Sequence, residues 1–255
     1  MDMLCIDINC DMGASYGVYT LGYDEQAISH VTSINVACGF HASDPSTMLR
    51  TVKLAKKHGV AVGAHPSFPD LVGFGRRYMG STPGEIKADV MYQIGALAAL
   101  CKSEGITLQH VKVHGALYNM AEKDIIIATA IAQAIKAVDE KLYMICLSNS
   151  TMVTAAQNIG IKYVEEAFAD RAYTRDGTLV PRKHEGAVIH DVNKVTERVL
   201  SMVKNKTVSS IDGSTVKISP QTICVHGDTP GAVEIIKAIR DSLDQQCIAV
   251  KAFSK

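Results

Sequence analysis

Short apolar runs alternate along the chain with longer segments in which apolar residues recur at helical spacing. Several of the short runs are almost continuously apolar, which is typical of parallel strands that are covered on both faces. The pattern predicts strands at residues 5–10, 33–38, 61–64, 110–113, 143–147, 162–165 and 222–225.

The longer segments carry helix start and stop signals at their ends. Asp44 is the expected N-cap of a helix that begins at Pro45, and Gly59 is its expected stop. Thr82 precedes Pro83 in the same way at the start of the next helix. The signals predict helices at residues 45–58, 83–104, 123–137, 151–158 and 231–243.

Seven strands in alternation with helices predict an α/β fold, a seven-stranded TIM-like (β/α)7 barrel that is closed or nearly closed. An open doubly wound sheet is the main alternative, because the pattern does not fix closure. Residues 168–220 are too long for one connection, and we expect a polar loop, a helix at 192–204 and a hairpin (207–210 and 216–219) turned at Asp212-Gly213. We therefore expect a single barrel domain over residues 1–255, with an insertion at about 168–220 before the last strand.

Composition and charge exclude several classes of partner. The 26 Lys and Arg residues are balanced by 26 Asp and Glu residues without a basic block, so neither nucleic acid nor an anionic membrane is an expected partner. The apolar stretches are too short to span a membrane, and no basic region precedes the first strand, so we expect a cytoplasmic protein. The seven cysteines are scattered without a CxxC pair, which indicates reduced thiols.

Polar and ionisable residues gather where the predicted strands end. In α/β barrels the active site is built at the carboxyl ends of the parallel strands, so side chains at these positions are candidates for chemistry. Alternate residues of a strand share one face, so Asp7, Asn9 and Asp11 lie on the same side of the first strand. The candidates are Asp7, Asn9, Asp11, His41, His65, Lys112, His114, Glu166, Asp170, Arg171, His226 and Asp228.

Each histidine taken alone is more often structural than catalytic, and it is the convergence of several at strand ends that indicates function. We assign a structural role to the histidines in apparent helix or loop contexts: His30, His58, His110, His184 and His190. Cys38, which lies one residue off the histidine-bearing face in an apolar run, is expected to be a packed thiol rather than a nucleophile.

The loop "GFGRR" places Arg76 and Arg77 between glycines and the next helix, where they suit either an anion or a solvated surface. Pro230-Gly231 starts the last helix, and a helix N-terminus is a weak phosphate signal. There is no GxxxxGK[ST] motif, no GxGxxG in a strand–helix setting and no GxSxG elbow.

Seven blocks of the sequence, in order and spanning most of the chain, carry a family resemblance. The blocks are "DINCDMG", "NVACGFHASDP", "VGAHPSFPDLVGFGRR", "VKVHGALYN", "EAFADRAY", "GTLVPR" and "CVHGDTPGAV". Together they resemble the LamB/YcsF family, the A subunits of prokaryotic 5-oxoprolinase. Two positions depart from the usual pattern: Ala14 replaces an acidic residue and Val113 replaces a proline.

The resemblance implies a barrel related to those of sugar deacetylases. It also implies ATP-dependent opening of 5-oxo-L-proline to L-glutamate, with release of ADP and phosphate, together with separate subunits B and C. The substrates would be 5-oxoproline and ATP, the latter with Mg²⁺.

Within that reaction the candidates receive roles from their charge and position. Asp11 would be the general base or would accept the lactam N–H, with Asp7 and Asn9 orienting, and His41, His65 and His114 would relay protons and stabilise an oxyanion. The phosphate candidates are Lys112, Arg76, Arg77, His226 and Asp228. The candidates for Mg²⁺-ATP or the charged groups of the substrate are Glu166, Asp170 and Arg171.

Two other functions use the same residues. Asp11, His41 and His65 suit a divalent metal that activates water in a metal-dependent amide or N-acetyl hydrolase. Alternatively, the chain is a non-catalytic subunit that binds a small molecule while its partners carry the chemistry.

Overall fold

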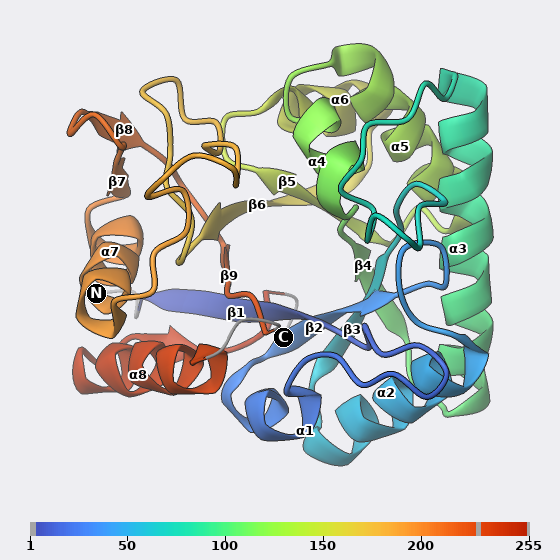
Figure 1. Cartoon of the computed structure of the whole chain (residues 1–255), viewed down its shortest axis with the longest axis horizontal. Helices are drawn as coiled ribbons and strands as arrows, with labels where there is room; N and C mark the ends of the chain where they lie inside the picture. The colour runs from blue at the N-terminus through green and yellow to red at the C-terminus, as the bar shows by residue number, and fades with distance from the viewer. Residues whose placement is uncertain (1–3, 228–230, 254–255) are drawn as a thin grey trace.

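Seven parallel strands form a closed barrel in the computed structural model, which describes residues 4–227 and 231–253 (Figure 1). Neighbouring strands pair in the order β1, β2, β3, β4, β5, β6 and β9, and β9 pairs with β1 as well as with β6, which closes the ring. The closed barrel is confirmed, and the open sheet is wrong. The strands are β1 (Cys5–Met12), β2 (Ser33–Ala37), β3 (Ala61–His65), β4 (Leu108–Val111), β5 (Tyr143–Leu147), β6 (Lys162–Phe168) and β9 (Thr222–Cys224).

Helices surround the barrel, and local sequence signals fix several of their ends. The Asp44 carboxylate accepts hydrogen bonds from the backbone N–H groups of Ser46 and Thr47, and Thr82 forms a capping box with Glu85. The helices are α1 (Asp24–Ala27), η1 (Ile28–His30, 3-10), α2 (Pro45–His58), α3 (Pro83–Ser103), α4 (Gly115–Ala121), α5 (Ile125–Val138), α6 (Thr151–Ile159), α7 (Val192–Lys204) and α8 (Ala232–Gln245).

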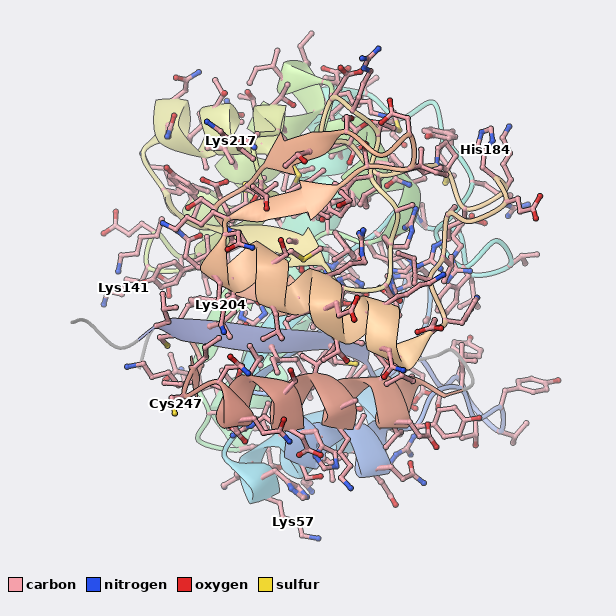
Figure 2. The ribbon with its side chains drawn as sticks, turned by 90° about the vertical axis from the view of Figure 1, so that its left-hand side faces the viewer. Lys57, Lys141, His184, Lys204, Lys217 and Cys247 are labelled. Carbon is pink, nitrogen blue, oxygen red and sulfur yellow. The ribbon has the colours of Figure 1, made fainter. Side chains whose placement is uncertain are left out.

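The connection between β6 and β9 contains α7 and the hairpin of β7 (Thr207–Ser209) and β8 (Thr215–Lys217). Seen from the side, α7 and α8 lie side by side across the front of β1, and the labelled Lys57, Lys141, Lys204 and Lys217 point outward (Figure 2). A long loop, residues 169–191, precedes α7 and lies at the mouth of the barrel (Figure 1).

Four short elements were not predicted: α1, η1, α4 and β10. Helices α1 and α4 have no side-chain N-cap, and β10 (Ala249–Val250) consists of two residues that pair with Cys5 and Ile6. Such short elements form because the rest of the barrel supplies their packing, and their local sequence carries little signal.

The barrel interior is polar, because β1 alternates between two environments. Ile8 and Cys10 belong to the hydrophobic core, whereas Asp7, Asn9 and Asp11 bond to polar side chains of neighbouring strands. Within the described residues no helix is long and apolar enough to cross a membrane.

His110 fills part of this interior, and a glycine makes room for it. His110 lies on β4, in agreement with the strand predicted at 110–113, so the helix or loop context also assigned to it is wrong; its Nε2 is 2.8 Å from the Asn35 Oδ1. Its role in the structure is nevertheless a packed and hydrogen-bonded one. A Cβ added to Gly63 would lie 2.0 Å from His110 Nε2, so only glycine fits opposite this ring.

Replacement of Gly63 by alanine should therefore destabilise the fold by about 1–3 kcal/mol or more, because the added methyl group overpacks a closed interior. The matched control is Gly95→Ala on α3, where an added Cβ meets no atom within 4 Å. That change should be neutral or stabilising by up to about 1 kcal/mol, through helix propensity. Urea unfolding of both variants checks the pair, and equal stabilities would contradict the packing argument.

Candidate active site at the carboxyl end of the barrel

A cavity of about 340 Å³ opens at the carboxyl ends of the strands. Its lining includes side chains from β1, β3 and β9 or the residues just after them, and from the loops after β2, β3 and β6. The residues predicted from the sequence that line it are Asp11, His41, His65, Arg76, Lys112, His114, Arg171 and His226.

Lys112 is the central charge of the site, although its side chain is only 2% exposed. Its ammonium lies 2.8 Å from Glu166 Oε1 and 3.4 Å from Asp11 Oδ1, and it also donates to Asn9 Oδ1 and Cys224 Sγ. Burial alone would lower the pKa of Lys112, but the surrounding acidic groups, Asp11 first, raise it well above its ordinary value. Lys112 is therefore a permanent cation.

Asp11 is held as an anion at the edge of the cavity. Asn35 Nδ2 donates to its Oδ1 at 2.8 Å, and the Nε2 of His65 lies 3.3 Å from its Oδ2. Burial would raise the pKa of Asp11, yet the charges of His65 and Lys112 bring it well below its ordinary value. The carboxylate is thus a fixed hydrogen-bond acceptor and a weak base.

His65 and His114 belong to one row of hydrogen bonds, and the partners of each ring nitrogen determine how many N–H groups the two rings carry. His65 Nδ1 lies 2.6 Å from the Lys112 carbonyl oxygen, and His114 Nε2 lies 2.9 Å from that of Phe74, so both nitrogens must donate. His65 Nε2 and His114 Nδ1 are 2.9 Å apart, which requires a third hydrogen between them. Two rings with three N–H groups carry one positive charge.

The position of Asp11 assigns that charge to His65. The Asp11 carboxylate lies beside His65 Nε2, whereas burial and the neighbouring histidines bring the pKa of His114 well below its ordinary value. His65 is therefore the imidazolium, and His114 is neutral. These hydrogen positions follow from the bonding pattern.

His41 is the histidine of this cluster whose Nδ1 makes no hydrogen bond. Its ring stacks on that of His114, with centroids 4.0 Å apart and planes 9° apart, and its buried Nδ1 has no hydrogen-bond partner. Burial, followed by the charge of His65, brings the pKa of His41 well below its ordinary value. His41 is thus a neutral imidazole at the wall of the cavity.

The three histidines offer nitrogen atoms within 4.8 Å of one another, which is close enough to consider a metal ion. However, the stacked rings of His41 and His114 direct their in-plane lone pairs along nearly parallel planes, not toward one point. His65 and His114 also use their facing nitrogens on each other. This donor arrangement does not fit a single tetrahedral ion.

Three of the predicted site residues lie below the cavity rather than at it. Asn9 and Glu166 bond to each other at 2.9 Å, and Asp7 accepts hydrogen bonds from Thr222, Thr32 and Ser33. None of Asp7, Asn9 and Glu166 lines the cavity, so Asp7 and Asn9 lie where they can orient other groups, and a part of these three residues in binding substrate or nucleotide stays a prediction. Their place deeper in the barrel follows from the strand register, because each lies at least two residues before the end of its strand.

The two arginines of the "GFGRR" loop separate. Arg76 lines the cavity, with its guanidinium 5.0 Å from the centre of the Phe74 ring. Arg77 instead pairs with Asp70 and has a 65% exposed side chain, which fits the solvated-surface alternative, and its assignment as a phosphate ligand stays a prediction. Adjacent residues in a loop commonly point to opposite sides.

His226 lies between the carboxylate of Asp170 and the guanidinium of Arg182. Its Nδ1 is 2.8 Å from Asp170 Oδ2, and its Nε2 is 2.7 Å from Nη2 of Arg182. Asp170 does not line the cavity and is the hydrogen-bond partner of His226, and its contact with Mg²⁺-ATP or substrate stays a prediction. Asp228 lies outside the described residues.

The cavity also contains residues that sequence reasoning missed. Tyr118 donates from its hydroxyl to Glu166 Oε2 at 3.0 Å, and Arg182 and Lys183 line the mouth. Tyr118 belongs to "VKVHGALYN" and Arg182 to "GTLVPR", so the family blocks carried the signal. Neither residue directly follows a predicted strand, which is why the strand-end rule missed them.

Cys38 is a packed residue, as expected. Its side chain is buried, and its thiol donates to the carbonyl oxygen of Val36 at 3.1 Å. Burial raises the pKa of Cys38 to about 12, so that a thiolate nucleophile is not available at neutral pH.

The fold and the site together define an α/β-barrel protein with a polar cavity at the carboxyl ends of its strands, where barrel enzymes carry their active sites. The model of the LamB/YcsF family matches residues 6–255, and the chain belongs to this family.

Named relatives match over almost their whole length. The chain is 54% identical to the A subunit of 5-oxoprolinase from Clostridium beijerinckii, with 97% of each protein covered. It is 52% identical to the A subunit of the same enzyme from Pyrococcus abyssi, with 96% of each covered. The crystal structure of a lactam utilization protein from Thermus thermophilus is 47% identical and superposes with a TM-score of 0.93, covering 98% of this chain and 100% of that one.

The buried Asp7 should make stability depend on pH. Burial raises the pKa of Asp7 from 3.8 to about 6, despite its hydroxyl donors, so the folded state binds the proton more tightly than the unfolded state. Its contribution is fully present below pH 3.8 and is lost as the pH rises to about 6. Asp7→Asn removes the ionisable group and with it this dependence of stability on pH.

The unfolding free energy of Asp7→Asn relative to wild type should therefore rise by about 1.4 kcal/mol per pH unit across that window. Urea unfolding at several pH values measures the difference, with the exposed Asp176→Asn as control. If the difference in unfolding free energy between the variant and wild type stays constant with pH, the raised pKa of Asp7 is contradicted.

Proposed function

We propose that this chain is the A subunit of a 5-oxoprolinase and that, with its partner subunits B and C, it opens 5-oxo-L-proline to L-glutamate at the expense of ATP. The names of its relatives support a role in such a hydrolase. The chemistry of the cavity supports the substrate class and the course of the reaction.

The observation that carries this proposal is one fixed carboxylate among cations and neutral imidazoles in a small cavity. Among the residues that the structure describes, Asp11 is the one carboxylate of the lining, and it is accompanied by Arg76, Lys112, Arg171, Arg182 and Lys183. Such a charge balance favours a small anion, as both 5-oxoproline and a transferred phosphoryl group are. The volume of about 340 Å³ is near the lower end for small-molecule sites.

ATP makes the reaction possible because a five-membered lactam is an unstrained, resonance-stabilised amide. Transfer of the γ-phosphoryl group to the lactam oxygen, with release of ADP, converts the amide into an imidate-like electrophile. Water then adds to the ring carbon, and cleavage of the carbon–nitrogen bond frees the amino group and leaves an acyl phosphate. A second water hydrolyses this acyl phosphate to the carboxylate of L-glutamate and phosphate. Such a path needs a base for water, an acceptor for the ring N–H and cations for the phosphoryl oxygens.

The geometry suggests how the side chains divide these tasks. Asp11, a weak base with a fixed orientation, accepts the hydrogen bond of the lactam N–H. His41, neutral and with an unpartnered Nδ1, takes the proton of the attacking water. The His65 imidazolium and Lys112 stabilise negative charge that develops on oxygen.

Asp11→Asn and His41→Gln should each lower the rate of ATP-dependent glutamate formation by about 100-fold or more, because an uncharged amide accepts a hydrogen bond more weakly than a carboxylate and cannot take up a proton as an imidazole does. The assay combines the chain with its candidate partner subunits and follows ADP and glutamate from 5-oxo-L-proline. Asp176→Asn, a change of the same kind at an exposed turn, is the control and should keep wild-type rates.

Wild-type rates in both site variants would indicate that the partner subunits catalyse the reaction and that this chain has a binding role. No ADP and no glutamate from the complete wild-type mixture would overturn the proposed function itself.

A metal-dependent hydrolase is the second candidate, since three histidines lie close together. The hydrogen bond between His65 and His114 and the stacking of His41 on His114 argue against an ion at this cluster, so we expect purified protein to contain far less than one transition-metal ion per chain. Protein treated with a chelator, desalted and returned to Mg²⁺ and ATP should regain full activity. One tightly held ion, with activity restored by that ion and not by Mg²⁺, would favour the metal-dependent reaction instead.

A further inference from the structure

Arg171 carries a buried charge that no acidic group of the described residues neutralises by an ion pair. Its side chain is 5% exposed and lines the cavity. It donates to two neutral carbonyl oxygens, those of Ala187, 3.3 Å from Nε, and Val180, 2.6 Å from Nη2. These bonds fix the plane of the guanidinium but leave its charge unmatched.

Arg182 lies close enough to Arg171 for the two charges to oppose each other. Burial and the charge of Arg182 lower the pKa of Arg171 to about 10, with Asp170, Tyr173 and Glu122 acting in the opposite direction. Because arginine cannot accept a hydrogen bond, His226 must accept from Arg182 and give its own N–H to Asp170. The Asp170 carboxylate is therefore separated from Arg182 by a neutral ring.

Both arginines come from one side of the barrel mouth. The 169–191 loop, which contains them, follows β6, and in Figure 1 it lies across the mouth from the ends of β2 and β3. His41 and His65 belong to that opposite side. Two guanidinium groups of this loop thus face the histidine cluster across the cavity, and the third guanidinium of the lining, that of Arg76, lies on the histidine side over the Phe74 ring.

We propose that Arg171 and Arg182 bind the carboxylate of the lactam substrate and so make this carboxylate a requirement for binding. The inference rests on the proposed function and names a specificity determinant within it. The planar fork of a guanidinium matches the two oxygens of a carboxylate, and a partly dehydrated site strengthens the pairing. A bound anion offsets the repulsion between the two arginines and leaves the lactam ring directed toward Asp11 and His41.

The test compares two lactams that differ in one group: 5-oxo-L-proline and 2-pyrrolidinone, which has the same ring without the carboxylate. Calorimetry gives the Kd of each lactam for the chain and for its complex with the partner subunits, and steady-state kinetics give KM and kcat. The variants are Arg182→Lys and Arg171→Lys, which keep the charge but lose the fork. Arg175→Lys, in the same loop with a 74% exposed side chain, is the matched control.

Wild type should bind 5-oxo-L-proline more tightly than 2-pyrrolidinone. Each site variant should raise Kd and KM for 5-oxo-L-proline by about 10-fold or more, with a smaller effect on kcat. Binding of 2-pyrrolidinone and the KM for ATP should not change. Arg182 is half-buried and outside the regular elements, so Arg182→Lys decides the question even if Arg171→Lys fails to fold by circular dichroism.

Equal affinity of wild type for the two lactams would overturn the proposal, as would unchanged 5-oxo-L-proline binding in Arg182→Lys. So would variants that raise only the KM for ATP and weaken inhibition by inorganic phosphate, because the arginines would then hold a phosphoryl group. Arginine-dependent binding of 5-oxo-L-proline by a complex that makes no glutamate would refute the proposed function while supporting the carboxylate site.

Discussion

The buried ammonium of Lys112 is the constraint around which the barrel is organised. A charge removed from water costs several kcal/mol unless it is paired and hydrogen-bonded, and Lys112 is almost completely buried. Glu166 and Asp11 supply the opposite charge, and Asn9 supplies a further acceptor. These partners need donors of their own, so polar side chains on β1, β2, β6 and β9 fill a space that many barrels fill with aliphatic residues.

The same cation sets the chemistry at the mouth of the barrel. Lys112 and the His65 imidazolium keep Asp11 ionised, and burial together with that imidazolium keeps His41 and His114 neutral. One small cavity therefore holds an ionised carboxylate, neutral imidazoles and several cations at the same time. The loop after β6 completes the arrangement with the two arginines on the opposite side.

Much of the site could be predicted from the sequence, because the carboxyl ends of parallel strands meet at one edge. Asp11, His41, His65 and His114 came together as that rule requires. Asp7 was placed at the rim because strand alternation gives the face of a residue but not its depth. Arg77 was grouped with Arg76 because a loop sequence does not determine which side chain turns inward. His110 was assigned to a non-strand context although it lies on β4.

The sequence by itself determined the local structure of this protein: the strand positions, the caps at Asp44 and Thr82, and the turn at Asp212-Gly213. These features depend on interactions between near neighbours, which periodicity and cap chemistry describe. Only the tertiary structure decided closure of the barrel, the single positive charge on the His65–His114 pair and the meeting of Arg171 with Arg182 in one cavity. Those outcomes depend on distances of a few ångströms between segments far apart in the chain, because proton positions and ion pairs change with such small displacements.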